Sequence, residues 1–279
     1  MQARSLLITG ASSGIGLAAA MTLKARGWRV WATARTDTDL QRLASLGLEP
    51  VHLDLRDPAS IAKAAALVLA ATGGRLDALF NNAASGQAGA VEDLPTDALR
   101  DQFEVNLFGW HDLTRRLLPA MRARGSGRIV NCSSVLGIVA LKYRGAYIAS
   151  KFALEGLTDA LRLELRGSGI DVVTIRPGPI ATHFVETSLA LLETDIDVQH
   201  SPHAAAYDRR IARGRRGGTG RMKSGPDAVV KKLIHALESP RPRPYYSVTV
   251  LTVLMDWARR LLTGRALVRA LAAISDREA

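Results

Sequence analysis

Residues 5–16 read Ser-Leu-Leu-Ile-Thr-Gly-Ala-Ser-Ser-Gly-Ile-Gly and precede an alanine- and leucine-rich stretch that ends near Arg26. The first five residues are an apolar run of strand length, and the alanine-rich stretch has the character of a helix. A glycine turn between a strand and a helix lets the backbone approach a pyrophosphate, and the helix start offers it free N–H groups. This order predicts a nucleotide site, with an ordinary loop as the alternative.

The same strand-helix alternation continues along the chain. Strands are predicted near residues 5–10, 28–34, 50–55, 76–82, 127–133, 170–176 and 245–250. Helical patterns lie between most of them, which is typical of an α/β fold with a doubly wound, mainly parallel sheet of the Rossmann type. No repeat or linker marks a second domain, so residues 1–279 are expected to form a single domain.

A second pattern is Tyr147-Ile-Ala-Ser-Lys151, which places a phenol and an ammonium four residues apart on one face of a helix. A phenol with its ordinary pKa near ~10 exchanges protons poorly at neutral pH, but a neighbouring cation lowers that pKa. We therefore expect Tyr147 to exchange a proton with a hydroxyl or carbonyl oxygen. Taken alone, the pattern also arises by chance in amphipathic helices.

Together these motifs resemble the short-chain dehydrogenase/reductase family. Thr9-Gly10-x-x-x-Gly14-Ile15-Gly16 is similar to its cofactor turn, and Asn81-Asn82-Ala83-Ala84 to its Asn-Asn-Ala-Gly element, with alanine in place of the last glycine. Residues 177–182, Pro-Gly-Pro-Ile-Ala-Thr, resemble the segment that contacts the nicotinamide carboxamide. The resemblance runs from about residue 5 to about residue 240 and is greatest with the steroid- and retinol-dehydrogenase-like members.

The resemblance implies a catalytic set made of Asn106, Ser134, Tyr147 and Lys151. Tyr147 would exchange the proton, Ser134 would bind the substrate oxygen, and Lys151 would lower the pKa of Tyr147 and bind the nicotinamide ribose. Asn106 would orient a water that connects Lys151 to solvent. Ser133 competes with Ser134, and we prefer Ser134 because its thirteen-residue distance from Tyr147 resembles the family's interval.

The resemblance also implies a cofactor site. Its expected members are Gly10, Ser12, Ser13, Gly14, Ile15, Gly16, Arg35, Asp54, Leu55, Asn82, Ala83, Tyr147, Lys151, Pro177, Gly178, Ile180 and Thr182. Arg35 stands where a carboxylate would bind the ribose hydroxyls of NAD, and its guanidinium can pair with a 2′-phosphate. We therefore expect NADP(H), with NAD(H) as the second choice and a plain surface charge as the alternative for Arg35. Asp54 would contact the adenine amino group, unless it caps a helix, a task for which Asp57 is better placed.

Composition fits this interpretation. A length of 279 residues and an apolar fraction of 47% suit one globular domain with a large core. Cys132, the only cysteine, lies in an apolar run and is expected to be a buried, inert thiol. Residues 1–4 lead directly into the first strand without room for a signal peptide, and no apolar run approaches the ~18 residues of a membrane span. We expect a cytoplasmic protein.

The expected reaction interconverts a ketone or aldehyde with an alcohol, and the resemblance suggests an apolar, steroid- or retinol-like substrate. The substrate lid would span about residues 183–225. It carries the basic residues Arg209, Arg210, Arg213, Arg215, Arg216, Arg221 and Lys223. We favour a solvated, glycine-interrupted loop, and the alternative is a surface that receives an anionic carrier, as in a ketoacyl-thioester reductase. A non-catalytic NADPH-binding regulator is a further alternative.

Other partners are weighed from charge and residue type. The net charge of +11 comes without a recognition motif, so no nucleic acid is expected. His183, His200 and His203 lack a supporting ligand set, so no metal is expected. The C-terminal helical extension, about 251–279, would cover the site, pair subunits in a homodimer or homotetramer, or rest on a membrane surface. For it, packing within the protein or a dimer is the favoured interpretation.

Overall fold

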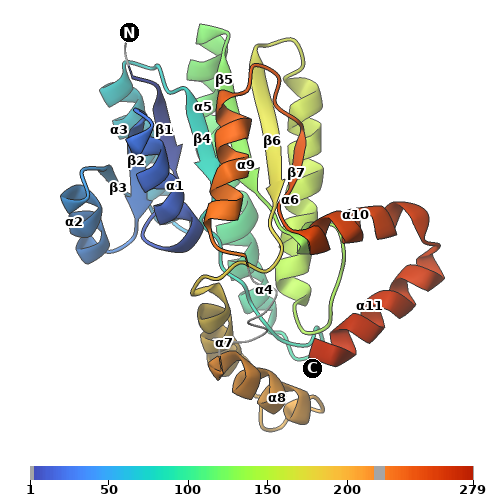
Figure 1. Cartoon of the computed structure of the whole chain (residues 1–279). Coiled ribbons are helices and arrows are strands. Elements are labelled where there is room, and N and C mark those ends of the chain that lie inside the picture. The colour runs from blue at the N-terminus through green and yellow to red at the C-terminus, as the bar shows by residue number, and fades with distance from the viewer. Residues whose placement is uncertain (1–2, 217–223, 279) are drawn as a thin grey trace.

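The structure, a computed structural model, describes residues 3–216 and 224–278, without the side chains of 277 and 278. Within these residues one sheet is formed by β1 (Ser5–Ile8), β2 (Arg29–Ala34), β3 (Glu49–His52), β4 (Ala78–Asn81), β5 (Gly127–Cys132), β6 (Ile170–Arg176) and β7 (Tyr245–Ser247). Neighbouring strands are parallel and follow the order β3-β2-β1-β4-β5-β6-β7 (Figure 1). Every predicted strand region holds a strand, and the predicted doubly wound α/β fold is confirmed.

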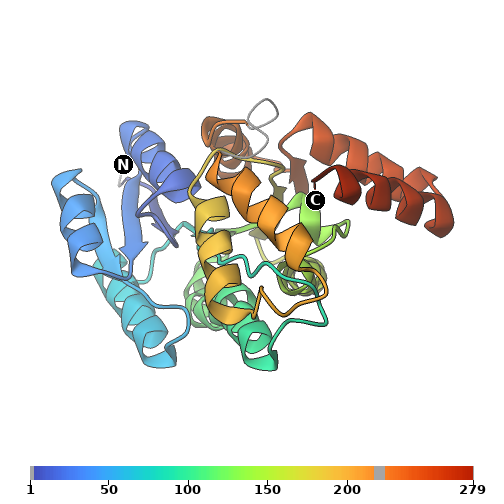
Figure 2. The ribbon, with the colours of Figure 1, turned by 90° about the horizontal axis from the view of Figure 1, so that it is seen from below.

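Helices cover both faces of the sheet. They are α1 (Gly14–Ala25), α2 (Asp37–Ser45), α3 (Pro58–Thr72), α4 (Thr96–Phe103), α5 (Gly109–Arg124), α6 (Gly145–Glu164), α7 (Phe184–Asp195), α8 (Ala204–Arg215), α9 (Asp227–Glu238), α10 (Val250–Leu261) and α11 (Gly264–Glu278). A π-helical segment, η1 (Glu104–Phe108), joins α4 to α5, and a 3-10 turn, η2 (Val135–Gly137), follows β5. α1 packs beside α9 on one face, and α3 packs beside α5 on the other (Figure 2).

Strand and helix boundaries follow from local chemistry. β1 and β4 are buried along their whole length, as expected for central parallel strands that are covered on both faces. α3 begins with Pro58 in its first turn, behind Asp57, whose carboxylate accepts a hydrogen bond from the N–H of Ala59 at 2.8 Å. Gly73, with φ of +58°, ends the helix.

Two expectations about the second half of the chain are wrong. The expected loop of the lid contains α7 and α8, which are held together by an apolar cluster that includes Leu192 and Tyr207, both fully buried. The last predicted strand reached residue 250, but β7 ends at Ser247. Thr249 accepts a hydrogen bond from the N–H of Thr252 at 3.2 Å and thereby starts α10.

The two C-terminal helices project from the side of the body, next to β7, in both views (Figures 1 and 2). Among residues 3–216 and 224–278, no helix combines the length and the apolar character that crossing a membrane requires.

Candidate active site

The glycine turn lies where the carboxyl ends of β1 and β4 meet, at the point where the strand order reverses. Gly10 has φ of +65°, and a Cβ at this position would stand 2.8 Å from the Cα of Ala83. A Cβ on Gly16 would overlap with the carbonyl oxygen of Gly10, and Gly14, with φ of +53°, lies against Thr182. The three glycines therefore let separate backbone segments approach closely.

Thr9 and Asn82 hold this turn in place. The hydroxyl of Thr9 accepts hydrogen bonds from the N–H of Asn82 at 2.8 Å and of Ala83 at 3.0 Å. The side-chain amide of Asn82 donates to the carbonyl oxygens of Thr9 at 3.0 Å and Gly10 at 3.2 Å. The predicted cofactor residues Gly10, Asn82 and Ala83 are thus adjacent.

The start of α1 fits the pyrophosphate of a dinucleotide. Its N-cap, Ser13, makes no side-chain capping hydrogen bond, so its hydroxyl leaves the N–H groups of the first turn to other acceptors. Ser12 is half-buried in the turn, and Ile15 packs inward against the core. A helix start of this kind, next to three closely packed glycines, is suited to an anionic group.

Two arginines stand near the turn. Thr33, near the end of β2, accepts a hydrogen bond from the N–H of Gly10 at 3.1 Å, so the exposed Arg35 follows close beside the turn. Arg42 reaches back from α2, donates to the carbonyl oxygen of Ser12 and pairs with Asp39 at 2.8 Å. Arg42 was not among the predicted site residues, since only the position of α2 over the turn brings it there.

Asp54 and Leu55 follow β3 on the same edge of the sheet. The carboxylate of Asp54 accepts a hydrogen bond from the N–H of Arg56 at 2.9 Å. Leu55 is buried, and its carbonyl oxygen faces Gly109 at the start of α5. Asp54 caps no helix, because Asp57 caps α3.

The segment after β6 closes the other side of the turn. The carbonyl oxygen of Pro177 accepts a hydrogen bond from the N–H of Val135 at 2.7 Å, which joins the loops after β5 and β6. Gly178 lies against the side chain of Thr249, and Ile180 packs against the core. Together with Thr182, this segment therefore links the glycine turn to the catalytic candidates.

The hydroxyl of Ser134 lies close enough to the phenol of Tyr147 to lower its pKa. Ser134 directly precedes η2, and its hydroxyl also accepts a hydrogen bond from the N–H of Leu136 at 3.0 Å. The hydroxyl of Ser133 is buried without a hydrogen-bond partner among the described residues. The structure thus brings Ser134 rather than Ser133 to Tyr147.

Lys151 lies one turn after Tyr147 on α6 and is 1% exposed. Its ammonium donates to the carbonyl oxygen of Cys132 at 2.9 Å and stands 4.4 Å from the ring centre of Trp110. The ring centre of Tyr147 is 5.7 Å away. Lys151 is therefore at the site, but its present partners are a carbonyl group and an aromatic face.

Burial controls the protonation of both residues. It lowers the pKa of Lys151 to about 8, although the neighbouring Cys132 and Glu155 act in the opposite direction. Burial raises the pKa of Tyr147, although the nearby hydroxyl of Ser134 acts to lower it. The expectation that Lys151 lowers the pKa of Tyr147 is thus not met, because the ammonium is directed at Cys132 and Trp110. Near neutral pH, Tyr147 is a phenol.

Asn106 sits in the π-helical segment η1, a kind of local irregularity that is frequent at functional sites. Its side-chain amide donates to the carbonyl oxygen of Ser85 at 2.9 Å and to the hydroxyl of Ser150 at 3.1 Å. Trp110, four residues later, donates from its indole N–H to the carbonyl oxygen of Ala83 at 2.8 Å. The helical spacing between Asn106 and Trp110 is a signal that could have identified this tryptophan.

Tyr147 belongs to an apolar cluster that gathers side chains from distant segments. They come from the loop after β5, from α6 and from the C-terminal helices: Val135, Leu136, Val139, Leu141, Ile148, Met255 and Leu271. Phe184, at the start of α7, places its ring centre 5.3 Å from that of Tyr147. The surroundings of the phenol are therefore mainly apolar.

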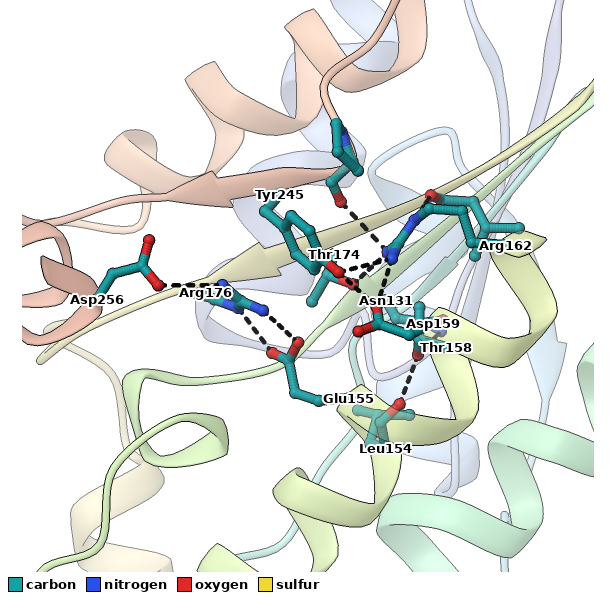
Figure 3. Close-up of polar contacts among 12 residues, drawn as sticks. Asn131, Leu154, Glu155, Thr158, Asp159, Arg162, Thr174, Arg176, Tyr245 and Asp256 are labelled. Atoms are coloured by element: carbon teal, nitrogen blue, oxygen red, sulfur yellow. Dashed lines mark hydrogen bonds and ion pairs between the residues drawn. The ribbon is translucent and has the colours of Figure 1, made fainter. Parts of the chain in front are cut away.

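A polar network holds the middle of α6 (Figure 3). Arg176 binds Glu155 with two hydrogen bonds of 2.9 and 2.7 Å, and both side chains are 9% exposed. Arg176 also approaches Asp256 of α10 at 3.7 Å. Because Glu155 is four residues after Lys151, this network links α6 to β6 and to α10.

Each of the three histidines has its own carboxylate partner: His183 pairs with Glu186, His200 with Asp197 and His203 with Glu92. No group of three or more metal-ligating side chains occurs among the described residues. Burial raises the pKa of the Cys132 thiol to about 11, as expected for an inert cysteine.

The basic residues of the predicted lid lie mostly on one helix. Arg209, Arg210, Arg213 and Arg215 are on α8, where Arg215 pairs with Glu193 of α7 at 2.8 Å. Arg216 ends that helix. Arg221 and Lys223 lie outside the described residues.

Comparison with known proteins supports this picture. A family model for short chain dehydrogenases matches residues 4–190. The chain is 43% identical over 264 residues to the uncharacterized oxidoreductase YbbO of Escherichia coli (strain K12), covering 95% of this chain and 92% of that protein. It is 35% identical to 17-beta-hydroxysteroid dehydrogenase type 1 of Homo sapiens, covering 88% of this chain and 77% of that protein.

Solved structures with bound cofactor have the same fold. An actinorhodin polyketide ketoreductase with NADPH has a TM-score of 0.71 at 31% identity and covers 88% of this chain and 96% of its own. A short chain dehydrogenase/reductase from Burkholderia phymatum in complex with NAD has a TM-score of 0.78 at 26% identity, covering 93% of this chain and 92% of its own. Both cofactors thus occur on this fold.

Proposed function

We propose a specific reaction for this chain, which belongs to the short-chain dehydrogenase family and is an NAD(P)-dependent oxidoreductase. The chain interconverts a ketone or aldehyde with an alcohol, prefers NADP(H) and uses Tyr147 as general acid and base. The observation that carries the proposal is the placement of Ser134 close to Tyr147, with the buried Lys151 one turn after Tyr147 on α6.

Each catalytic candidate has a role in proton transfer. The bound nicotinamide supplies or accepts a hydride at its C4. In the reduction, the hydroxyl of Ser134 donates a hydrogen bond to the substrate oxygen and stabilises the developing negative charge. Tyr147 donates its proton to that oxygen, and its raised pKa keeps this proton in place at neutral pH. Lys151, whose pKa is about 8, and Asn106 would support this proton transfer.

The preference for NADP(H) rests on the arginines near the turn. Gly10, Gly14, Gly16 and the start of α1 would hold the pyrophosphate. Arg35 and Arg42 would pair with the 2′-phosphate, and Asp54 with the adenine amino group. No carboxylate follows β2 directly, where it would bind the ribose hydroxyls of NAD.

The apolar surroundings of Tyr147 favour an apolar substrate. Phe184, Met255 and Leu271 come from three different helices and offer no charge to a substrate. An apolar wall of this kind binds a hydrocarbon skeleton and leaves orientation to the few polar groups, here Ser134 and Tyr147. The likeness to a hydroxysteroid dehydrogenase points in the same direction.

A ketoacyl-thioester reductase is the second candidate, because four arginines lie on α8 and a polyketide ketoreductase is a structural neighbour. Glutamine at Arg213, Arg215 and Arg216 should then weaken the use of coenzyme A thioesters but not of small ketones, and activity on the thioesters should fall with salt. A non-catalytic regulator explains the adjacent Ser134 and Tyr147 less well, since cofactor sensing needs no proton donor.

The test is a screen of ketones, aldehydes and secondary alcohols of rising hydrophobicity, with NADPH, NADH and their oxidised forms, followed at the nicotinamide absorbance band. We expect turnover that is faster with NADPH and rises with substrate hydrophobicity. Turnover confined to carrier-bound thioesters would favour the second candidate. NADPH binding without turnover of any substrate would favour the regulator.

A further inference from the structure

The outward face of α10 is apolar. At the spacing of a single helix face it carries Val250, Val253, Leu254, Trp257 and Leu261. All five are exposed, Trp257 by 56% and Leu261 by 73%. A surface helix of a globular protein normally turns such a face toward the core, so this orientation needs an explanation.

The opposite side of α10 is anchored, which prevents the helix from turning its apolar face inward. Thr252 is fully buried, and Met255 belongs to the apolar cluster around Tyr147. Asp256 pairs with Arg176, which is held by Glu155 (Figure 3). The outward direction of the apolar face therefore follows from specific contacts of α10 with the body.

α11 runs back from the end of α10, so that its last residues contact the loop that precedes α6. The hydroxyl of Ser275 accepts a hydrogen bond from the N–H of Lys142 at 3.2 Å, and Asp276 pairs with the Lys142 ammonium at 2.5 Å. Val268 is 67% exposed on this helix, whereas Leu271 contacts the cluster around Tyr147. Both helices thus have one side on the body and one side away from it.

Arginines surround the exposed apolar residues. Arg259, Arg260, Arg265 and Arg269 are exposed on the two helices. Among the described acidic side chains of these helices, Asp276 pairs with Lys142, and Asp256 pairs with Arg176 and, at 3.4 Å, with Arg260. Arg259 lies over the ring of Phe152, so Arg265 and Arg269 are the arginines that have no carboxylate partner among the described residues. The surface therefore combines exposed apolar side chains, an exposed tryptophan and an excess of positive charge.

We propose that the outward face of α10 and α11 docks on an anionic phospholipid surface. Amphipathic helices with arginines and a tryptophan beside an apolar face bind at the boundary between headgroups and acyl chains. Anionic headgroups complement the excess of arginine over carboxylate on these helices, above all Arg265 and Arg269. A second copy of the chain complements them less well, because a two-fold contact brings each patch onto itself and sets arginines against arginines.

Docking in this way also suits the chemistry of the site. Met255 and Leu271 connect the inner sides of both helices to the cluster that contains Tyr147. If the substrate is apolar, as proposed above, a bilayer is where it accumulates, and the docked helices place the site beside it. Only this consequence rests on the proposed function, because lipid binding itself is independent of turnover.

The experiment measures binding of the full chain to vesicles. Phosphatidylcholine vesicles are compared with equal mixtures of phosphatidylcholine and phosphatidylglycerol, by sedimentation and by tryptophan fluorescence. Trp257 is the reporter, since Trp28, Trp31 and Trp110 are only 5%, 4% and 1% exposed. We expect binding to the mixed vesicles at low salt with a blue shift of the emission, and much weaker binding to phosphatidylcholine alone.

Variants assign the binding to this face. Leu254→Ser with Val250→Ser should weaken binding by about tenfold or more, because two apolar side chains no longer enter the lipid. Arg265→Gln with Arg269→Gln should weaken it by roughly tenfold at low salt only. The control is Leu67→Ser on α3, an apolar residue with 49% exposure elsewhere, which should bind like the wild type. Thermal unfolding checks that all variants are folded.

Any of the following results would overturn the proposal. One is no binding of the wild type to mixed vesicles at low salt, and another is equal binding to both vesicle types. A loss of binding in the Leu67 control equal to that in the α10 variant would also overturn it. So would a dimer in light scattering that the Leu254 and Val250 changes dissociate, which would make a second copy the occupant of this face.

Discussion

The two sides of the candidate site are built in different ways. On the cofactor side, the glycine turn at residues 10–16 packs backbone against backbone, and a Cβ on Gly10 would already lie 2.8 Å from Ala83. On the substrate side, Tyr147 lies beside Phe184 and packs against an apolar cluster that Met255 and Leu271 also contact, and these three side chains come from three separate helices.

This difference explains why the sequence indicates the class of cofactor more directly than the substrate. A turn that admits only glycine leaves a short motif in the chain, since its restriction acts within a few residues. An apolar wall accepts many side chains of similar volume, and its members are far apart in sequence. The cofactor side is thus defined by a motif, and the substrate side by tertiary packing.

The largest effect is expected at Tyr147, which lies between the two sides. Tyr147→Phe keeps the ring in its apolar surroundings but removes the proton donor, so kcat/KM should fall by about 10²–10⁴-fold. The dissociation constant for NADPH, measured by fluorescence titration, should stay nearly the same. The variant is tested with a substrate whose chemical step is rate-limiting. If its turnover is then close to that of the wild type, Tyr147 is not the proton donor.

The next largest effect is expected on stability, at the buried ion pair of Arg176 and Glu155. Arg176→Met leaves the buried carboxylate of Glu155 without its bidentate partner and should lower the free energy of unfolding by about 3 kcal/mol. Denaturant titration measures the loss. The double change Arg176→Met with Glu155→Leu should recover most of it, because the pair is replaced by apolar side chains. If the double variant is as unstable as the single one, the lost free energy of unfolding comes from packing and not from the unpaired carboxylate.

On the cofactor side, Arg35→Asp should shift the ratio of kcat/KM from NADPH toward NADH by roughly tenfold or more, since a carboxylate repels the 2′-phosphate and accepts from ribose hydroxyls. Arg42→Gln should weaken NADPH use less strongly and leave NADH use unchanged. If the substrate KM shifts as much as the cofactor KM, the two sides are not separate units.

The smallest effect concerns the pH dependence of stability. The pKa of Lys151 is lowered from its ordinary 10.5 to about 8 by burial, so above pH 8 the folded chain binds fewer protons than the unfolded chain. Stability from this group should therefore rise with pH, by about 1 kcal/mol between pH 8 and 9.

Lys151→Met provides the comparison. Buried Cys132, with a pKa raised to about 11, acts in the opposite direction above pH 9 and is present in both proteins. Lys151 also lowers the pKa of Cys132, so the two proteins are compared between pH 8 and 9, below the pKa of about 11 of the buried thiol. The same slope in both proteins would mean that Lys151 titrates near its ordinary pKa.

The sequence alone determined the seven strands, the glycine turn and the spacing of Tyr147 and Lys151. These features depend on local periodicity and on backbone restrictions within a few residues, so they can be recognised in the printed chain. The resemblance also led to Ser134, and the structure places its hydroxyl against Tyr147.

Only the tertiary structure decided how distant segments meet. It turned the expected lid loop into α7 and α8, brought Arg42 to Ser12, and directed the Lys151 ammonium to Cys132. The sequence of α10 shows that one face is apolar, but periodicity is the same whether that face points inward or outward. Its direction is decided by the anchors on the other face, above all Thr252 and the contact of Asp256 with Arg176, and these exist only in the folded chain.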